Sequence, residues 1–169
     1  MLDFVTEAII LKKEPLGDFN ATYTFFTKDV GKVTARATSV RKITSRLSAH
    51  LEPGLLSQIR LVAKKGTLGN RSHFQVVDAL LDHRIFIDHT FLEMVSQMML
   101  LSQADQTLWN FLLTGNTDKK AILTLCGFGG EQSCVNCNSP AVTLYHPDQE
   151  FMCENCSFSI PKKLVTYLK

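Results

Sequence analysis

Four cysteines near the C-terminus form two Cys-x-x-Cys pairs, Cys134 with Cys137 and Cys153 with Cys156, and fifteen residues separate the pairs. The two-residue gap lets a tight turn direct both sulfurs of a pair to one point, so two pairs supply four thiolates for a tetrahedral site. Four sulfurs fill the coordination sphere of zinc, which leaves no position for an activated water. The pattern therefore predicts one structural Zn²⁺ ion.

Three other interpretations of this cluster are open. The thiols could form disulfides, a rubredoxin-like iron could take the same ligands, and His146 could replace one cysteine. Short strand-like segments at 140–145 and around Phe151 flank a break at 146–148, so we expect a zinc ribbon over about residues 131–158. The fifth cysteine, Cys126, lacks a partner at this spacing and is expected to be a small buried hydrophobe.

The charge of the chain is divided along its length. The net charge is +2, but residues 1–75 carry twelve Lys and Arg against six Asp and Glu, whereas residues 76–169 carry six against ten. The first part is therefore expected to attract polyanions, and a merely solvated basic surface is the alternative. The predicted nucleic-acid-binding residues are Lys32, Arg36, Arg41, Lys42, Arg46, Lys64, Lys65 and Arg71.

Five strand-like segments occupy 5–13, 21–26, 33–40, 55–62 and 73–77. Alternation in the second and third predicts that Tyr23 and Phe25 point inward and Arg36 outward. Five short strands with glycine-bearing turns in about 80 residues are typical of a small barrel of the oligonucleotide-binding (OB) type, although an open sheet or an SH3-like barrel also fits. The aromatic side chains of these strands are expected to lie mostly in the core.

Helical periodicity follows, in segments 91–102, 108–113 and 117–127. We therefore expect an α+β protein in which an OB-fold domain, residues 1–80, precedes a small helical domain, residues 81–169, that carries the Cys₄ zinc ribbon. The Met and aromatic residues of the helices are expected to be core. The absence of a long apolar run or of a signal-sequence pattern, together with the paired thiols, indicates a cytoplasmic protein with no membrane contact.

Six short motifs, in this order, resemble the RecO family of bacterial DNA repair proteins. They lie at residues 7–11, 15–18, 26–33, 45–47, 51–54 and 125–128. The resemblance covers most of the chain. It implies an OB fold, binding of single- and double-stranded DNA at the nucleoid, annealing of complementary strands, and cooperation with RecR in loading RecA.

The resemblance also implies contact between the helical part and the acidic tail of single-strand-binding protein. The candidate cations for that contact are Lys119, Lys120, Lys162 and Lys163. The helices between barrel and ribbon are shorter than in the family, and few residues follow Cys156, so the tail-binding surface is the least specific part of this expectation.

Motifs of catalysis are absent from the sequence. It has no phosphate-binding glycine loop, no His-Glu-x-x-His and no Gly-x-Ser-x-Gly. Asp78, Asp82 and Asp88 have helix-like spacing and could bind Mg²⁺ in a nuclease, but solvated acids on a helix face are the simpler interpretation. We therefore expect a DNA-binding recombination mediator that is not an enzyme. The alternatives are an accessory protein of translation or transcription and, less favoured, a nuclease.

Overall fold

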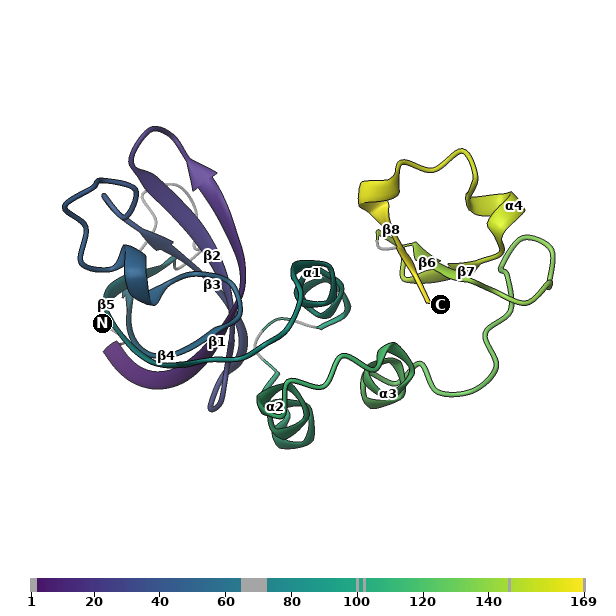
Figure 1. Ribbon diagram of the computed structural model, residues 1–169, viewed down its shortest axis with the longest axis horizontal. Helices are drawn as coiled ribbons and strands as arrows, with labels where there is room; N and C mark the ends of the chain where they lie inside the picture. The colour runs from purple at the N-terminus through teal and green to yellow at the C-terminus, as the bar shows by residue number, and fades with distance from the viewer. Residues whose placement is uncertain (1–2, 65–72, 100, 102, 146, 169) are drawn as a thin grey trace. The chain divides into compact units, whose positions relative to one another are not determined.

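The chain is divided into two compact units, Met1–Thr117 and Asp118–Lys169. The computed structural model describes residues 3–64, 73–99, 101, 103–145 and 147–168 (Figure 1). Among the described residues, the first unit contains a five-stranded sheet with two α-helices, and the second contains two short α-helices, a small sheet and the cysteine pairs.

The sheet of the first unit is formed by β1 (Asp3–Leu16), β2 (Asn20–Thr27), β3 (Gly31–Ala37), β4 (Leu55–Lys64) and β5 (His73–Arg84). Three strands run antiparallel in sequence order, and β4 returns to pair antiparallel with β1. β5 then pairs antiparallel with β4 and parallel with β3. Each strand thus pairs with two others, in a Greek-key order. Together with the helices, this sheet confirms the predicted α+β class.

Alternating side chains fill the inside of this sheet, as the sequence predicts. Tyr23 and Phe25 are fully buried, and their rings stack with centroids 5.7 Å apart. On β3, Val33, Ala35 and Ala37 are buried. Arg36, which lies between Ala35 and Ala37, is exposed. The pattern of alternation therefore assigned the inner and outer faces of β2 and β3 correctly.

The fifth strand extends beyond its predicted end. The change of period after Asp78 indicates a helix in the sequence, but β5 continues to Arg84. Register shifts between β4 and β5, at Leu56/Ser57 and Arg60/Leu61, break the two-residue alternation. This irregularity is the physical reason that sequence periodicity did not identify the second half of the strand.

Two helices belong to the same unit as the sheet. α1 (His89–Met98) and α2 (Gln106–Leu113) begin at Asp88 and Asp105, whose side chains accept hydrogen bonds from backbone N–H groups of the first turn. The apolar face of α1 is buried, α1 packs against β1, and Trp109 of α2 packs against Phe26 with ring centroids 5.7 Å apart. The compact unit therefore extends to Thr117, beyond the predicted domain end at residue 80.

The turn between β2 and β3 is packed closely against the segment that joins α1 to α2. Gly31 has φ +76°, and a Cβ atom there would lie 2.1 Å from the backbone carbonyl carbon and oxygen of Gln103. Next to it, the Nζ of Lys32 donates hydrogen bonds to the carbonyl oxygens of Ser96 and, at 2.9 Å, Met99. Because the last carbonyls of a helix have no partner within the helix, Lys32 caps the C-terminus of α1.

The second unit consists of α3 (Lys119–Leu125), a sheet of order β7-β6-β8, and the short helix α4 (Glu154–Ser157). Its strands are β6 (Thr143–Tyr145), β7 (Glu150–Met152) and β8 (Val165–Tyr167). Two 3₁₀ turns, η1 (Ser48–His50) in the first unit and η2 (Lys162–Leu164) in the second, complete the elements. Among the described residues, every helix is too short or too polar to cross a bilayer.

Candidate metal centre and basic surface

A tight turn presents the first cysteine pair, and the start of the short helix α4 presents the second. After Cys134 the chain turns back, so that the N–H of Asn138 donates to the carbonyl of Cys134 at 2.9 Å, and Asn138 adopts φ +57°. Asparagine tolerates this left-handed conformation better than most residues. The second pair begins at Cys153, immediately before α4, and the β6–β7 hairpin joins the two pairs. The hairpin therefore fixes the separation of the pairs.

The four sulfurs gather at one point. The Sγ atoms of Cys134, Cys137, Cys153 and Cys156 all lie within 4.8 Å of one another. Cys137 Sγ is 3.6 Å from Cys153 Sγ and 3.8 Å from Cys156 Sγ. A regular tetrahedron with Zn–S bonds of about 2.3 Å requires sulfur–sulfur distances of about 3.8 Å. The four residues therefore fit a tetrahedral thiolate site, and none of their thiols forms a disulfide in this structure.

The thiols of this cluster do not ionise independently. Hydrogen bonding at the backbone of Cys153 lowers the pKa of Cys134 to about 6, and a side-chain hydrogen bond with Ser139 lowers the pKa of Cys137. A hydrogen bond with the sulfur of Cys153 raises the pKa of Cys156 to about 12. A divalent cation at the centre would stabilise all four thiolates together, because a coordinating thiol is deprotonated.

The apolar core around the sulfurs is small. It contains Cys134, Cys153 and Met152, with Tyr145 and Ile160 packed against it only in part. Such a core is too small to stabilise a separate unit without a metal or disulfides. We conclude that the cluster could hold a metal ion and that its role would be structural. His146, the alternative ligand, lies outside the described residues.

The carboxylates that suggested a nuclease do not come together. Asp88 caps α1, Asp82 pairs with His83, and the carboxylate of Asp78 accepts a hydrogen bond from the N–H of Ala79. Over the described parts of the chain, one cluster of possible metal ligands is found, and it is the cysteine cluster.

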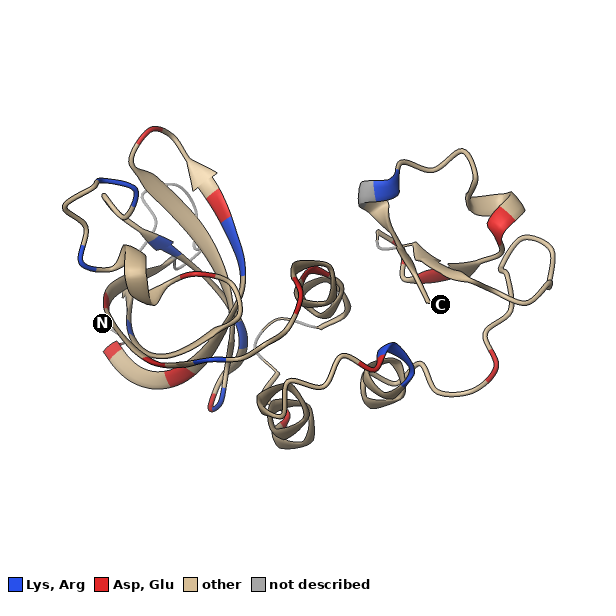
Figure 2. Ribbon diagram, in the orientation of Figure 1, with Lys and Arg blue, Asp and Glu red and all other residues tan. Residues whose placement is uncertain are grey.

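Two sets of cations can be distinguished among the described residues of the first unit. Lys12, Lys13, Lys28 and Arg60 each form an ion pair with a carboxylate. Four predicted nucleic-acid-binding residues, in contrast, are exposed and take part in none of the ion pairs made by described residues: Arg36, Arg41, Lys42 and Arg46. We call these four residues the basic surface. Figure 2 shows basic positions along the loop that follows β3.

Hydrogen bonds tie the loop of the basic surface to the turn between β1 and β2. The guanidinium of Arg41 donates to the carbonyl of Gly17 at 2.8 Å, and its backbone N–H donates to the carbonyl of Phe19 at 3.0 Å. The N–H of Ser39 donates to Asn20 Oδ1 at 2.9 Å. The loop 38–42 is therefore held beside residues 17–20, although the two segments are far apart in sequence.

The remaining predicted residues lie elsewhere or outside the described residues. Lys32 is half-buried, and its ammonium group is used in capping α1, so it is not part of the basic surface. Burial also lowers the pKa of Lys32. Lys65 and Arg71 lie outside the described residues, as does the side chain of Lys64.

Two exposed apolar residues of this region were not identified from the sequence. Phe19 is 53% exposed and Ile43 is fully exposed, both next to the basic surface. The Nζ of Lys42 lies 5.2 Å from the centroid of the Phe19 ring, within the range of a cation–π interaction. A lone phenylalanine in a polar turn would have been the available sequence signal. The aromatic residues that the sequence singled out, including Tyr23, Phe25 and Phe26, are buried in the core as expected.

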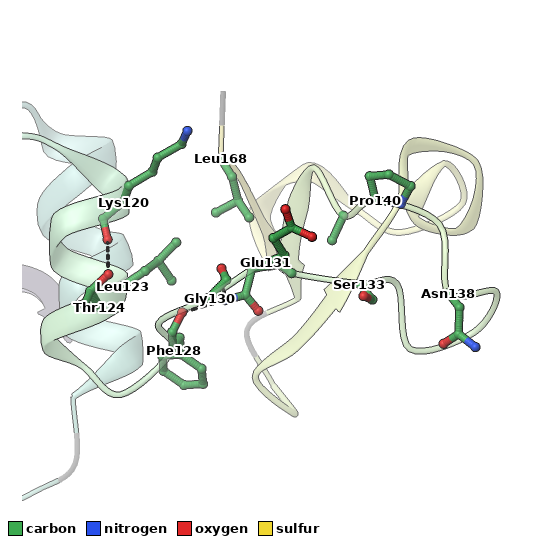
Figure 3. Close-up of a pocket in the computed structure, with 12 residues that line it drawn as sticks. Lys120, Leu123, Thr124, Phe128, Gly130, Glu131, Ser133, Asn138, Pro140 and Leu168 are labelled. Atoms are coloured by element: carbon green, nitrogen blue, oxygen red, sulfur yellow. Dashed lines mark hydrogen bonds between the residues drawn. The ribbon is translucent and has the colours of Figure 1, made fainter.

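A cavity of about 710 Å³ lies in the second unit, between α3 and the ribbon (Figure 3). Leu123, Phe128, Ala141 and Leu168 contribute apolar surface, and Lys120 and Glu131 contribute one charge of each sign. Of the other candidate cations for a tail-binding site, Lys119 donates to the carbonyl of Tyr167 at 2.6 Å, Lys162 is exposed, and the side chain of Lys163 lies outside the described residues.

Comparison with known proteins finds relatives of the N-terminal part of the chain. The family described as "Recombination protein O N terminal" matches residues 1–80. DNA repair protein RecO of Thermodesulfovibrio yellowstonii is 40% identical over 67 residues, which are 40% of this chain and 27% of that protein. DNA repair protein RecO of Dehalococcoides mccartyi is 41% identical over 63 residues, or 37% and 25% of the two chains.

The matches extend over about a quarter of the length of these relatives. The family match includes β1 to β4, most of β5 and all four residues of the basic surface. Residues 1–80 of the chain are therefore similar to the N-terminal domain of DNA repair protein RecO.

Proposed function

We propose that this protein is a DNA-binding mediator of repair and recombination, and that the basic surface is where it binds DNA. The observation that carries the proposal is the division of cations in the first unit. The paired cations are neutralised by their own carboxylates, whereas the four of the basic surface are available for phosphates. They lie on a domain whose relatives are named DNA repair proteins.

The topology of the sheet supports an OB-type mode of binding. Small five-stranded Greek-key barrels of this type bind oligonucleotides on one face and in adjoining loops. The basic surface combines one strand, β3, with the loop that follows it. Phosphate contacts from such a surface position DNA with little dependence on sequence.

The proposed activity needs binding and no chemical step. Cations that neutralise the phosphates of two strands reduce the repulsion between those strands, which favours annealing. We accordingly propose strand annealing, and loading of RecA together with RecR, as the role of the protein, and a structural Zn²⁺ at the four cysteines.

Titration of fluorescent single-stranded DNA, duplex DNA and RNA at two or more salt concentrations tests the proposal. If about four phosphates are neutralised, log K should fall with log salt with a slope of about −2.8 for single strands and about −3.6 for duplex. The triple variant Arg41→Ala, Lys42→Ala, Arg46→Ala should weaken binding to all sequences and reduce the steepness for single strands by about two units.

A charge-matched control separates local contacts from net charge. The variant Lys13→Ala, Lys28→Ala, Arg60→Ala removes three cations from the same unit, but these cations are ion-paired. It should leave the salt slope nearly unchanged. Equal effects of the two triple variants, in folded proteins, would contradict the proposed surface. Preference for structured RNA would favour the accessory-protein alternative, and Mg²⁺-dependent strand cleavage would favour the nuclease.

We also propose that the cavity of the second unit receives the acidic tail of a single-strand-binding protein. Its apolar wall, formed by Leu123, Phe128 and Leu168, suits apolar residues at the end of a peptide, and Lys120 offers a cation to the tail's carboxylates. Glu131, also at the cavity, would limit the affinity for an acidic peptide.

A fluorescently labelled tail peptide provides the test of this site. Lys120→Glu should abolish saturable binding at low salt. Lys162→Glu makes the same change of charge at an exposed lysine that does not line the cavity, and it should retain binding. If both variants lose binding equally, the peptide is attracted by net charge and the cavity is not its site.

A further inference from the structure

One aromatic ring on the surface of the first unit is not explained by packing. Phe19 lies between β1 and β2, two residues after Gly17, which turns the chain with φ +64°. More than half of the Phe19 side chain is exposed, at 53%, whereas the aromatic residues of the adjacent strand β2 are fully buried. Single exposed phenylalanines are common on protein surfaces, but the groups that surround Phe19 distinguish it from them.

The surroundings of Phe19 are fixed and positively charged. Its carbonyl accepts the hydrogen bond from the Arg41 N–H, and the Arg41 guanidinium donates to the carbonyl of Gly17, so two hydrogen bonds connect the cationic loop to the turn that carries the ring. The ammonium group of Lys42 lies over the ring, 5.2 Å from its centroid. Ile43 is fully exposed and follows Lys42 directly. An aromatic ring and two cations therefore share one small area, and an exposed apolar residue follows them in the loop.

This combination suits an unpaired nucleotide. A nucleobase presents an apolar face that stacks on an aromatic ring, and its phosphates bind nearby cations. In a duplex the base faces are stacked on one another and are not available to a ring on the protein surface. A phosphate-binding surface alone accepts single strands and duplex, whereas an added stacking site favours single strands.

We propose that Phe19 is a stacking site for an unpaired nucleobase, with Lys42 and Arg41 binding the phosphates beside that base. This inference rests on the proposed binding of nucleic acid at the basic surface and adds to it the feature that discriminates single strands from duplex. Lys42 has two tasks in this arrangement, because it lies against the ring and carries a charge for phosphate.

The test compares affinities of purified variants for a single-stranded DNA, a single-stranded RNA and a duplex DNA of equal length. Stacking is worth about 1–3 kcal/mol per base, so Phe19→Ala should lower the single-strand affinity about 5- to 150-fold. The duplex affinity should change by less than about twofold, and the slope of log K against log salt should remain that of the parent, because no cation is removed. The DNA and RNA strands distinguish the source of the base.

Three further variants make the result specific. Phe19→Tyr keeps an aromatic ring and should retain the single-strand preference, whereas Phe19→Leu keeps apolar volume without a π face and should lose it. Phe86→Ala removes another exposed phenylalanine of the same unit, 86% exposed, and should leave all affinities unchanged. In addition, a 2-aminopurine base in the single strand should be quenched on binding to the parent and less so on binding to Phe19→Ala.

The outcomes separate this inference from the proposed function. If the parent binds single strands and duplex, but Phe19→Ala and Phe86→Ala behave alike, the stacking site is wrong and the basic surface stands. If Phe19→Ala weakens single strands and duplex equally, the ring only supports the cationic loop, and the inference fails. If the parent binds no nucleic acid, both proposals fail.

Discussion

The two units of this protein are stabilised in different ways. The first has a core of at least fifteen buried residues inside its sheet, including Ile10, Tyr23, Phe25 and Leu61. The second has three-residue strands, and the core around its sulfurs includes three buried residues, two of them cysteines. An apolar core can stabilise the first unit by itself, whereas we expect the second to need a metal ion at its sulfurs. The basic surface lies on the first unit and the cysteine cluster on the second.

Loss of one sulfur ligand should cause the largest loss of stability, and this loss should be confined to the second unit. Structural zinc contributes about 10–16 kcal/mol of apparent binding free energy in small peptides, which exceeds what a short ribbon gains from its own packing. Cys137→Ser is therefore expected to release the metal and unfold the ribbon. Elemental analysis should find one zinc per parent chain and none in the variant, and hydrogen exchange should increase in residues 131–158 only.

Cys126→Ser is the matched control for that variant. Cys126 is a cysteine of the same unit that lies outside the four-sulfur cluster. Its substitution should leave the metal content at one per chain. The prediction is contradicted if the parent protein, purified without chelators, contains no stoichiometric metal. Iron in place of zinc would correct the identity of the ion.

Truncation of a core side chain of the sheet should destabilise the first unit and leave the second unit unchanged. Phe25 is fully buried within the sheet, so Phe25→Ala should lower the free energy of unfolding of the first unit by about 3–5 kcal/mol. Metal content should not change. Phe158→Ala removes a phenylalanine that is 90% exposed and should have little effect on either unit. Urea unfolding followed by hydrogen exchange distinguishes the units, and metal loss in Phe25→Ala would show that the two are coupled.

The sequence was most informative where a pattern has a single structural meaning. Cysteine spacing identified the four residues that come together, and alternation identified the inner faces of β2 and β3. The sequence was least informative where tertiary contacts determine whether a strand forms and where it ends. The bulges that extend β5 leave no periodic signal, and the three residues of β8 are ordered by pairing with β6.

Individual cations show the same limit. Lys32 and Arg36 both lie on β3, and the sequence predicts the same nucleic-acid-binding role for both. Lys32 meets the carbonyl groups at the end of α1, more than 60 residues away in sequence, while Arg36 remains in solvent. Phe19 was overlooked for the same reason. Its position beside Lys42 depends on hydrogen bonds between the loop after β3 and the turn before β2, which are separated in sequence.

Two glycines in the same unit test how firmly the helices are attached to the sheet. Gly17 and Gly31 both have positive φ, but a Cβ on Gly17 would meet nothing within 4 Å, whereas one on Gly31 would collide with the Gln103 backbone. Alanine in a left-handed conformation costs about 1–2 kcal/mol, which is the expected loss for Gly17→Ala. Gly31→Ala should lose about 2–4 kcal/mol in total, because the collision adds to that strain. Equal losses in urea unfolding would show that the α1–α2 segment yields easily and that the sheet is the independent unit.

Replacement of Lys32 by methionine should have the smallest effect and should depend on pH. The variant keeps the apolar part of the side chain and removes the donor to the Ser96 and Met99 carbonyls, so about 1–2 kcal/mol of stability should be lost near neutral pH. Burial lowers the pKa of Lys32 below its ordinary value of 10.5. The unfolded chain therefore binds more protons than the folded chain between the two pKa values, and this contribution to the free energy of unfolding rises with pH through that interval. It is fully present above 10.5 and is lost as pH falls through the folded pKa. The parent should thus gain stability relative to Lys32→Met as pH is raised toward 10.5, as measured by urea unfolding of both proteins. A difference between the two proteins that stays constant with pH would mean that Lys32 titrates as an exposed lysine does and is not held against the end of α1.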